Sequence, residues 1–162
     1  MSKAVLLDRD GTINVDHGYL HDKSLLEFLP GAIEALQRLS AADFKLIIIT
    51  NQSGIGRGYF SKEQYEEFNE ELVAVLKSKG VEIAATYMCP HSPIDNCHCR
   101  KPYPYMALKA IEQFEIDPTR SYMLGDKGSD VECGEAAGVT ARLIDADHNL
   151  LYWANEIIDN RL

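Results

Sequence analysis

Short apolar runs alternate along this 162-residue chain with segments whose apolar residues recur at helical spacing. Buried strands are expected at residues 4–7, 45–49, 83–88, 122–124 and 139–144. The run KLIII at 45–49 is largely β-branched and unbroken, which suits a parallel strand covered on both faces. Helices are expected at residues 31–44, 61–79, 105–114, 130–137 and 150–158. Because this alternation builds right-handed βαβ units, the sequence predicts an α/β fold with a Rossmann-like parallel sheet and helices on both faces.

The length and composition are those of one ordinary domain. Hydrophobic residues make up 46% of the chain and charged residues 25%, close to the average for globular proteins. No internal repeat or linker is visible, and the second strand begins at Lys45, which leaves no room for a large inserted cap domain. We therefore expect a single domain over residues 1–162 and a monomer.

The net charge of −9 argues against nucleic-acid binding, which needs a basic surface. It would also repel an anionic substrate, so a phosphate site would need a metal ion or a few local cations. The N-terminal apolar run is too short for a secretory signal, and no later run approaches the length of a membrane span. The sequence predicts a cytoplasmic protein with neither a membrane nor a nucleic-acid partner.

Reactive side chains follow three of the expected strands. In open parallel sheets, ligands bind beyond the carboxyl ends of the strands, so these groups should meet at one edge. They are Asp8-Arg9-Asp10, Thr50-Asn51-Gln52-Ser53 and Gly125-Asp126-Lys127.

The carboxylates among these groups suit phosphoryl transfer. Asp8 can attack phosphorus and form an aspartyl-phosphate, provided that Mg²⁺ suppresses the repulsion between the two anions. Asp10 is then placed to protonate the leaving alcohol and later to deprotonate water. Asp126 supplies a second carboxylate to Mg²⁺, and Asp130, one helical turn later, can brace it. Taken alone, the pair Asp8 and Asp10 could equally be turn-forming residues.

Donors and cations complete the predicted phosphate site. Thr50, Asn51, Gln52 and Ser53 can hold the phosphoryl oxygens through hydroxyl, amide and backbone N–H groups. Lys101 and Lys127 can stabilise charge that develops in the transition state, and Arg100 suits bidentate contact with a phosphate. For Arg57, exposure to solvent and contact with substrate both remain open.

A cysteine-rich segment at residues 89–99 predicts a structural zinc site. Three thiolates and one imidazole form a closed tetrahedral ligand set that leaves no open position for chemistry. The expected ligands are Cys89, His91, Cys97 and Cys99. Bound zinc would fix an otherwise mobile loop and, with it, Arg100 and Lys101. His98 is not expected to be a ligand, and Cys133 is expected to be an inert packed thiol.

These motifs together resemble the haloacid dehalogenase superfamily. The resemblance is carried by Asp8-x-Asp10-Gly-Thr, the strand end at Thr50, a lysine at Lys101 and Gly125-Asp126-x-x-x-Asp130, which span most of the chain. It implies that Asp8 is the nucleophile, Asp10 the acid/base and Asp126 a Mg²⁺ ligand. It also implies that Thr50 and Lys101 bind phosphate, and that Asp10 offers its backbone carbonyl to the metal.

The zinc loop resembles those of two families within that superfamily, the heptose bisphosphate phosphatases and the histidinol-phosphate phosphatases. The stretches at 8–19, 50–58 and 125–127 resemble the heptose enzymes almost residue by residue. This implies hydrolysis of the C7 phosphate of D-glycero-D-manno-heptose 1,7-bisphosphate, an intermediate for lipopolysaccharide or related glycans. The implied substrate contacts are Asp16, His17, Gly18, Tyr19, Asn51, Gln52, Ser53, Arg100 and Lys127.

The spacing within the zinc loop keeps an alternative substrate open. Only five residues separate His91 from Cys97, as in the histidinol-phosphate phosphatases, so histidinol phosphate or another small phosphomonoester is the alternative. A zinc-stabilised binding module without catalysis is a third hypothesis. The sequence speaks against this third hypothesis, because none of the predicted catalytic positions is substituted.

Overall fold

A five-stranded sheet organises the computed structural model, which describes residues 1–162. All neighbouring strands are parallel, in the order β3-β2-β1-β4-β5. The strands are β1 (Ala4–Leu7), β2 (Lys45–Asn51), β3 (Ile83–Cys89), β4 (Tyr122–Gly125) and β5 (Thr140–Leu143). The order reverses between β1 and β4, and such a switch point is where ligands bind in open α/β sheets. The predicted fold class is confirmed.

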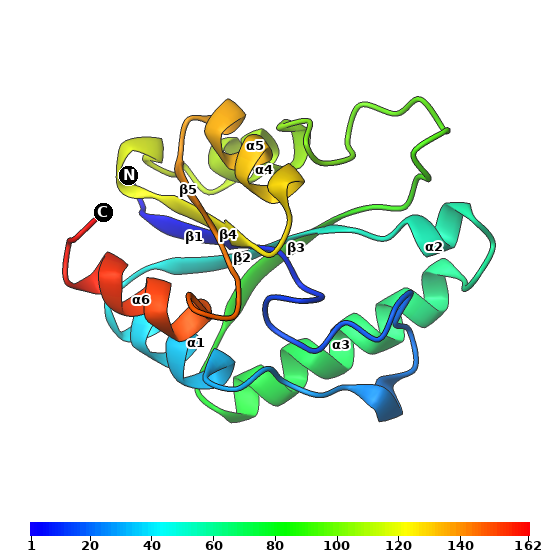
Figure 1. Cartoon of the computed structure of the whole chain (residues 1–162), viewed down its shortest axis with the longest axis horizontal. Helices are drawn as coiled ribbons and strands as arrows, with labels where there is room; N and C mark the ends of the chain where they lie inside the picture. The colour runs from blue at the N-terminus through cyan, green and yellow to red at the C-terminus, as the bar shows by residue number, and fades with distance from the viewer.

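Helices cover both faces of this sheet. Helices α4 and α5 pack on one face, and α1, α3 and α6 lie on the other (Figure 1). The helices are α1 (Ala32–Ala41), α2 (Ser53–Gly56), α3 (Lys62–Ser78), α4 (Tyr105–Gln113), α5 (Gly128–Ala137) and α6 (Leu150–Ile158), with 3₁₀ turns η1 (Lys23–Leu25) and η2 (Pro118–Arg120). None of these helices is both long and apolar enough to cross a membrane.

The alternation of side chains along β1 divides the core into two layers. Val5 and Leu7 pack into the cluster formed with α1, α3 and α6, whereas Ala4 and Leu6 pack into the cluster formed with α4 and α5. All four are fully buried. Because a strand points successive side chains to opposite faces, a wholly apolar strand is what a sheet covered on both sides requires. The covered sheet therefore holds the end of β1, and Asp8 after it, in a fixed position.

Most predicted element boundaries agree with the structure, and two differences matter for the site. Helix α5 begins at Gly128, earlier than expected, because the Asp130 carboxylate accepts a hydrogen bond from the backbone N–H of Lys127 and caps the first turn. Helix α2 was not predicted, since four residues are too few to show a helical period. It carries Ser53 to the edge of the sheet.

Candidate active site

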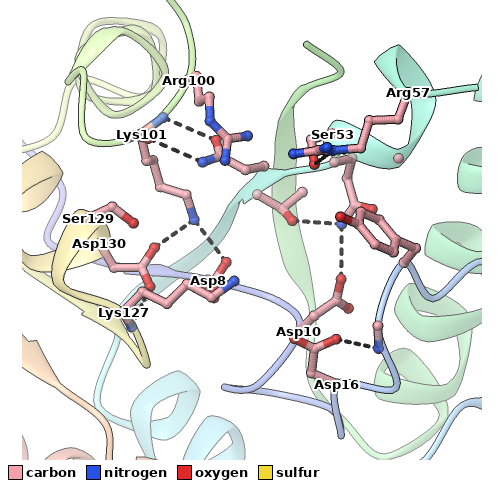
Figure 2. Close-up of a pocket in the computed structure, with 16 residues that line it drawn as sticks. Asp8, Asp10, Asp16, Ser53, Arg57, Arg100, Lys101, Lys127, Ser129 and Asp130 are labelled. Atoms are coloured by element: carbon pink, nitrogen blue, oxygen red, sulfur yellow. Dashed lines mark hydrogen bonds and ion pairs between the residues drawn. The ribbon is translucent and has the colours of Figure 1, made fainter. Parts of the chain in front are cut away.

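A polar cavity of about 280 Å³ lies where the carboxyl ends of β1, β2 and β4 meet. It brings together most of the predicted site residues, namely Asp8, Asp10, Asp16, Gly18, Tyr19, Thr50, Asn51, Gln52, Ser53, Arg100, Lys101 and Lys127 (Figure 2). Arg57, whose position the sequence left open, also lines it, as does Asp130. Gly54 and Ser129 were not predicted. Ser129 could have been anticipated, since it stands between two carboxylates at the start of a helix that follows a strand.

Lys101 is the buried cation at the centre of this cavity. Its Nζ lies 2.8 Å from Asp8 Oδ1 and 2.7 Å from Asp130 Oδ1, and it donates to the carbonyl of Ile49 at 2.7 Å. Burial disfavours the charged ammonium, but the two carboxylates outweigh it and raise the pKa of Lys101 above its usual value. The lysine is therefore held charged beside the predicted nucleophile.

The Asp10 carboxylate is surrounded by donors. Arg9 contacts both of its oxygens, at 2.9 and 3.1 Å, while Asn14 donates to Oδ1 at 3.0 Å and Gln52 to Oδ2 at 3.1 Å. Burial raises the pKa of a carboxyl group, but here the Arg9 charge and the hydrogen bonds from Arg9, Asn14 and Gln52 prevail and lower the pKa of Asp10. The same Gln52 amide reaches Thr50 Oγ1 at 2.9 Å, so Gln52 links two predicted catalytic side chains.

Arg9, for which the sequence predicts no role, is fully buried. Its guanidinium lies over the ring of Phe68 on α3, 4.6 Å from the centroid, and a cation over an aromatic face is attracted by the ring. A charged group in this position tolerates burial only because Asp10 neutralises it. Arg9 thus positions Asp10, the predicted acid/base, from the buried side of the cavity wall.

Three carboxylates form a candidate metal site beside Lys101. Ligand oxygens of Asp8, Asp126 and Asp130 all lie within 4.8 Å of one another. Burial, together with the neighbouring charges of Asp8 and Asp130, raises the pKa of Asp126 to about 7. Asp126 Oδ1 is buried without a hydrogen-bond partner, which is unusual for a carboxylate oxygen. The three carboxylates carry more negative charge than the single Lys101 ammonium offsets, so the site suits a divalent cation. Mg²⁺ fits it, because this ion binds through a few carboxylates and keeps several of its water ligands.

Glycine is required beside this site. A Cβ at Gly11 would lie 2.2 Å from Asp126 Oδ2, and the φ of Gly11 is +87°, a conformation that other residues rarely adopt. Asp126 does not line the main cavity but a neighbouring one that includes Gly11 and Thr12. His17 also lies outside the main cavity, with Nε2 3.9 Å from Glu27 Oε2, so its contact with substrate stays a prediction.

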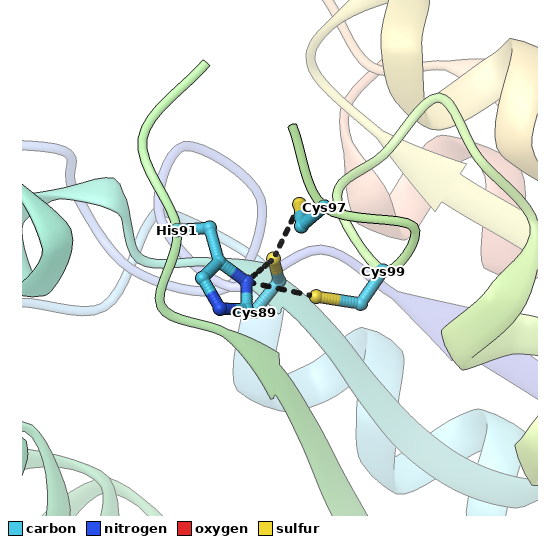
Figure 3. Close-up of side chains that lie close together, drawn as sticks. All are labelled: Cys89, His91, Cys97 and Cys99. Atoms are coloured by element: carbon cyan, nitrogen blue, oxygen red, sulfur yellow. Dashed lines mark hydrogen bonds between the residues drawn. The ribbon is translucent and has the colours of Figure 1, made fainter. Parts of the chain in front are cut away.

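The four predicted zinc ligands converge where β3 ends at Cys89 and the loop after it folds back (Figure 3). Cys89 Sγ lies 3.7 Å from Cys97 Sγ and 3.4 Å from His91 Nδ1, and the latter lies 3.3 Å from Cys99 Sγ. Tetrahedral zinc, with bonds of about 2.3 Å to sulfur and about 2.0 Å to nitrogen, separates two sulfurs by about 3.8 Å and a sulfur from a nitrogen by about 3.5 Å. The cluster therefore has the dimensions of a zinc site.

Asn51 connects this loop to the sheet. Its Oδ1 accepts from the backbone N–H of Lys101 at 3.1 Å, and its Nδ2 donates to the backbone carbonyl of Lys101 at 3.3 Å. The pair of bonds joins the end of β2 to the segment that follows Cys99. Lys101 is consequently placed from two sides, by the cysteine cluster and by β2.

Comparison with known proteins agrees with this geometry. A HAD-hydrolase-like family model matches residues 98–149. The D-glycero-beta-D-manno-heptose-1,7-bisphosphate 7-phosphatase of Pasteurella multocida is 46% identical over 145 residues, which cover 86% of this chain and 79% of that protein. The chain belongs to this phosphatase family. The phosphatase of the same name from Escherichia coli K12 is 43% identical, covering 87% of this chain and 78% of that protein.

Solved structures of the heptose bisphosphate phosphatase family share the fold. The D,D-heptose 1,7-bisphosphate phosphatase of B. bronchiseptica, crystallised with magnesium and phosphate, superposes with a TM-score of 0.90 at 28% identity and covers 98% of this chain and 99% of its own. The enzyme of Burkholderia thailandensis has a TM-score of 0.70 at 27% identity, covering 97% and 99%. The cavity and the carboxylate site described above thus lie in a phosphatase fold.

Proposed function

We propose that this protein is a Mg²⁺-dependent phosphatase that removes the C7 phosphate of D-glycero-D-manno-heptose 1,7-bisphosphate. The observation that carries the proposal is the buried contact between Lys101 Nζ and Asp8 Oδ1, beside two further carboxylates. A carboxylate held between a cation and a candidate metal site is suited to attack an anionic phosphorus. The names of the relatives support the heptose substrate over histidinol phosphate.

The chain's own residues account for both half-reactions. A carboxylate oxygen of Asp8 attacks phosphorus, the bond between phosphorus and the C7 oxygen breaks, and Asp10 gives its proton to that oxygen. Water then attacks the aspartyl-phosphate, Asp10 takes a proton from it, and inorganic phosphate leaves with Asp8 restored. The donors around Asp10 hold it charged, as the second half-reaction requires. To act as the acid in the first half-reaction, Asp10 must be protonated. Its protonated oxygen must then lose at least one of the hydrogen bonds that it accepts in this structure.

Thr50 and Lys101 are the proposed phosphate contacts. Thr50 Oγ1 accepts from Gln52, which leaves its hydroxyl hydrogen free to donate to a phosphoryl oxygen. The Lys101 ammonium faces the same region and stabilises the charge that grows in the transition state.

Asp8, Asp126 and the backbone carbonyl of Asp10 are the proposed Mg²⁺ ligands, and Asp130 braces them. The unpartnered Asp126 Oδ1 and the raised pKa of Asp126 are what such a site would show without its cation. When bound, Mg²⁺ offsets the repulsion between Asp8 and the phosphoryl oxygens.

We further propose that Cys89, His91, Cys97 and Cys99 bind one structural zinc ion. Burial raises the pKa of Cys89 and Cys99, so a cation is needed to keep these thiols ionised as ligands. Elemental analysis of protein purified without chelator should find about one zinc per chain. Fully folded, active protein without zinc would refute this part of the proposal.

A substrate comparison tests the proposed activity. Purified protein with Mg²⁺ should give a higher kcat/KM on heptose 1,7-bisphosphate than on histidinol phosphate, and Asp8→Asn should abolish turnover of both. A preference for histidinol phosphate would favour the alternative that the His91–Cys97 spacing left open. Equal activity of the wild type and Asp8→Asn on every substrate would refute the enzyme claim.

A further inference from the structure

We propose that Arg57 binds the second, non-transferred phosphate of the substrate and so makes this cavity selective for a bisphosphate. The proposal rests on the proposed function and extends it to a residue whose role the sequence left open. The group that Arg57 would bind is an anion on the same sugar, at a distance from the phosphorus that Asp8 attacks.

Three cations of the cavity have no ion-pair partner, against one carboxylate, Asp16, whose Oδ1 only accepts from the Gly18 backbone N–H. Lys101 is neutralised by Asp8 and Asp130, and Arg9 neutralises Asp10 from behind the cavity wall. No carboxylate lies within ion-pair distance of Arg57, Arg100 or Lys127. In a chain of net charge −9, unpaired cations gathered in one cavity indicate an anionic ligand larger than a single phosphoryl group.

Arg57 lies on the far side of the cavity from the reacting carboxylate. Figure 2 shows Arg57 and Ser53 across the cavity from Lys101 and Asp130. Arg57 also lines the adjoining groove between α2 and the zinc loop, so it stands at the border between the cavity and that groove. With its reacting phosphate at Asp8, the sugar would extend across the cavity toward this border.

The Arg57 guanidinium is held with its donors free. Its Nε donates to Ser53 Oγ at 3.4 Å, which leaves both terminal nitrogens for a ligand. Two N–H groups of a guanidinium match two oxygens of a phosphate, a geometry that lysine cannot reproduce.

An aromatic pair supports this arginine. The guanidinium lies 5.9 Å from the centroid of the Tyr19 ring, and the Tyr59 ring meets Tyr19 edge-on at a centroid distance of 4.7 Å. Edge-to-face rings stabilise each other beyond the area they bury. Tyr59 does not line the main cavity and is therefore a positioning residue, which acts on Arg57 through Tyr19.

Steady-state kinetics on two substrates test the proposal. The wild type and Arg57→Ala are compared on heptose 1,7-bisphosphate and on the same sugar that carries only the 7-phosphate. Losing a charge-assisted bidentate contact should raise KM for the bisphosphate roughly 10- to 100-fold, with kcat little changed. On the sugar that carries only the 7-phosphate, the variant and the wild type should have the same kcat and KM. Arg57→Lys should recover only part of the preference.

Control variants separate this role from a structural one. Arg120→Ala removes an exposed arginine far from the cavity and should leave kcat and KM on both substrates unchanged. Tyr59→Phe should keep the bisphosphate preference, because the ring contact remains, whereas Tyr59→Ala should reduce it through KM. If Arg57→Ala slowed both substrates equally, or neither, the proposal would be overturned. Faster wild-type turnover of histidinol phosphate would count against the proposed function alone, since the ratio between the two heptose substrates would still be measurable.

Discussion

Removing the ammonium of Lys101 should destabilise the Mg²⁺-free protein severely. The Lys101 side chain is 2% exposed and contacts two carboxylates, Asp8 and Asp130, that are 9% and 2% exposed. The substitution Lys101→Met keeps most of the side-chain volume but leaves these two acids without a cation. It also leaves the carbonyl of Ile49 without this donor.

The size of the effect follows from burial. Breaking a buried ion pair by removing one partner costs about 3–5 kcal/mol, because the remaining charge stays buried without compensation. For a domain of this size, each kcal/mol lowers Tm by about 2–4 °C, so the variant should melt roughly 6–20 °C below the wild type.

The loss of stability in Lys101→Met should also depend on pH. Burial and the Asp8 charge already raise the pKa of Asp130 above its unfolded value of about 4, and removing Lys101 takes away a charge and a hydrogen bond that lower it, so this pKa should rise further. A carboxyl whose pKa is raised on folding costs more stability as pH rises past the unfolded pKa, so the deficit should be small below about pH 4 and large at pH 8.

Urea unfolding at pH 8 in Mg²⁺-free buffer without chelator, which spares the zinc site, measures this change. Lys127→Met is the matched control, because Lys127 lines the same cavity without an ion pair, and it should stay within about 0.5 kcal/mol of the wild type. Millimolar Mg²⁺ should restore part of the stability of Lys101→Met, since it supplies positive charge to the same carboxylates. A loss below about 1 kcal/mol, or one independent of pH, would refute the electrostatic account of this cluster.

Three further substitutions test neighbouring features. Gly11→Ala should weaken Mg²⁺ binding at least about tenfold in isothermal titration calorimetry, because the new Cβ would lie 2.2 Å from Asp126 Oδ2, and unchanged affinity would count against Asp126 as a ligand. Arg9→Met should destabilise the protein by about 3–5 kcal/mol in urea unfolding, since it leaves Asp10 without its buried partner; a neutral effect would show that the pair is dispensable. Cys97→Ser should remove most of the bound zinc and make the loop at 89–99 a target for limited proteolysis, and a variant that retained zinc and resisted protease would refute the proposed ligand set.

The sequence could predict which strand ends carry chemistry because that information is local. An apolar run followed by Asp8 or Asp126 indicates a strand end in a parallel sheet, and the sheet brings such ends together. The structure accordingly places Asp8 and Asp126 in one cluster, although more than a hundred residues separate them along the chain.

The contacts that tune these groups could not be predicted, because they depend on partners distant in the chain. Arg9 resembles any charged residue near a turn, and only its contact with Phe68 on α3 and its pairing with Asp10 explain its burial. Likewise, the contact of Lys101 with Asp130 depends on how the loop after β3 meets the start of α5. In the loop at 16–19, the sequence could not show that His17 alone lies outside the cavity.

The central claim, that Asp8 forms the covalent intermediate, can be tested by trapping. Protein mixed with substrate and Mg²⁺ is quenched within milliseconds and reduced with borohydride, which converts an aspartyl-phosphate to homoserine, and the peptides are read by mass spectrometry. The account predicts the modification at position 8 and none in the chelated sample. A modification at Asp10, Asp126 or any other residue, or turnover that persists without divalent cations, would contradict it.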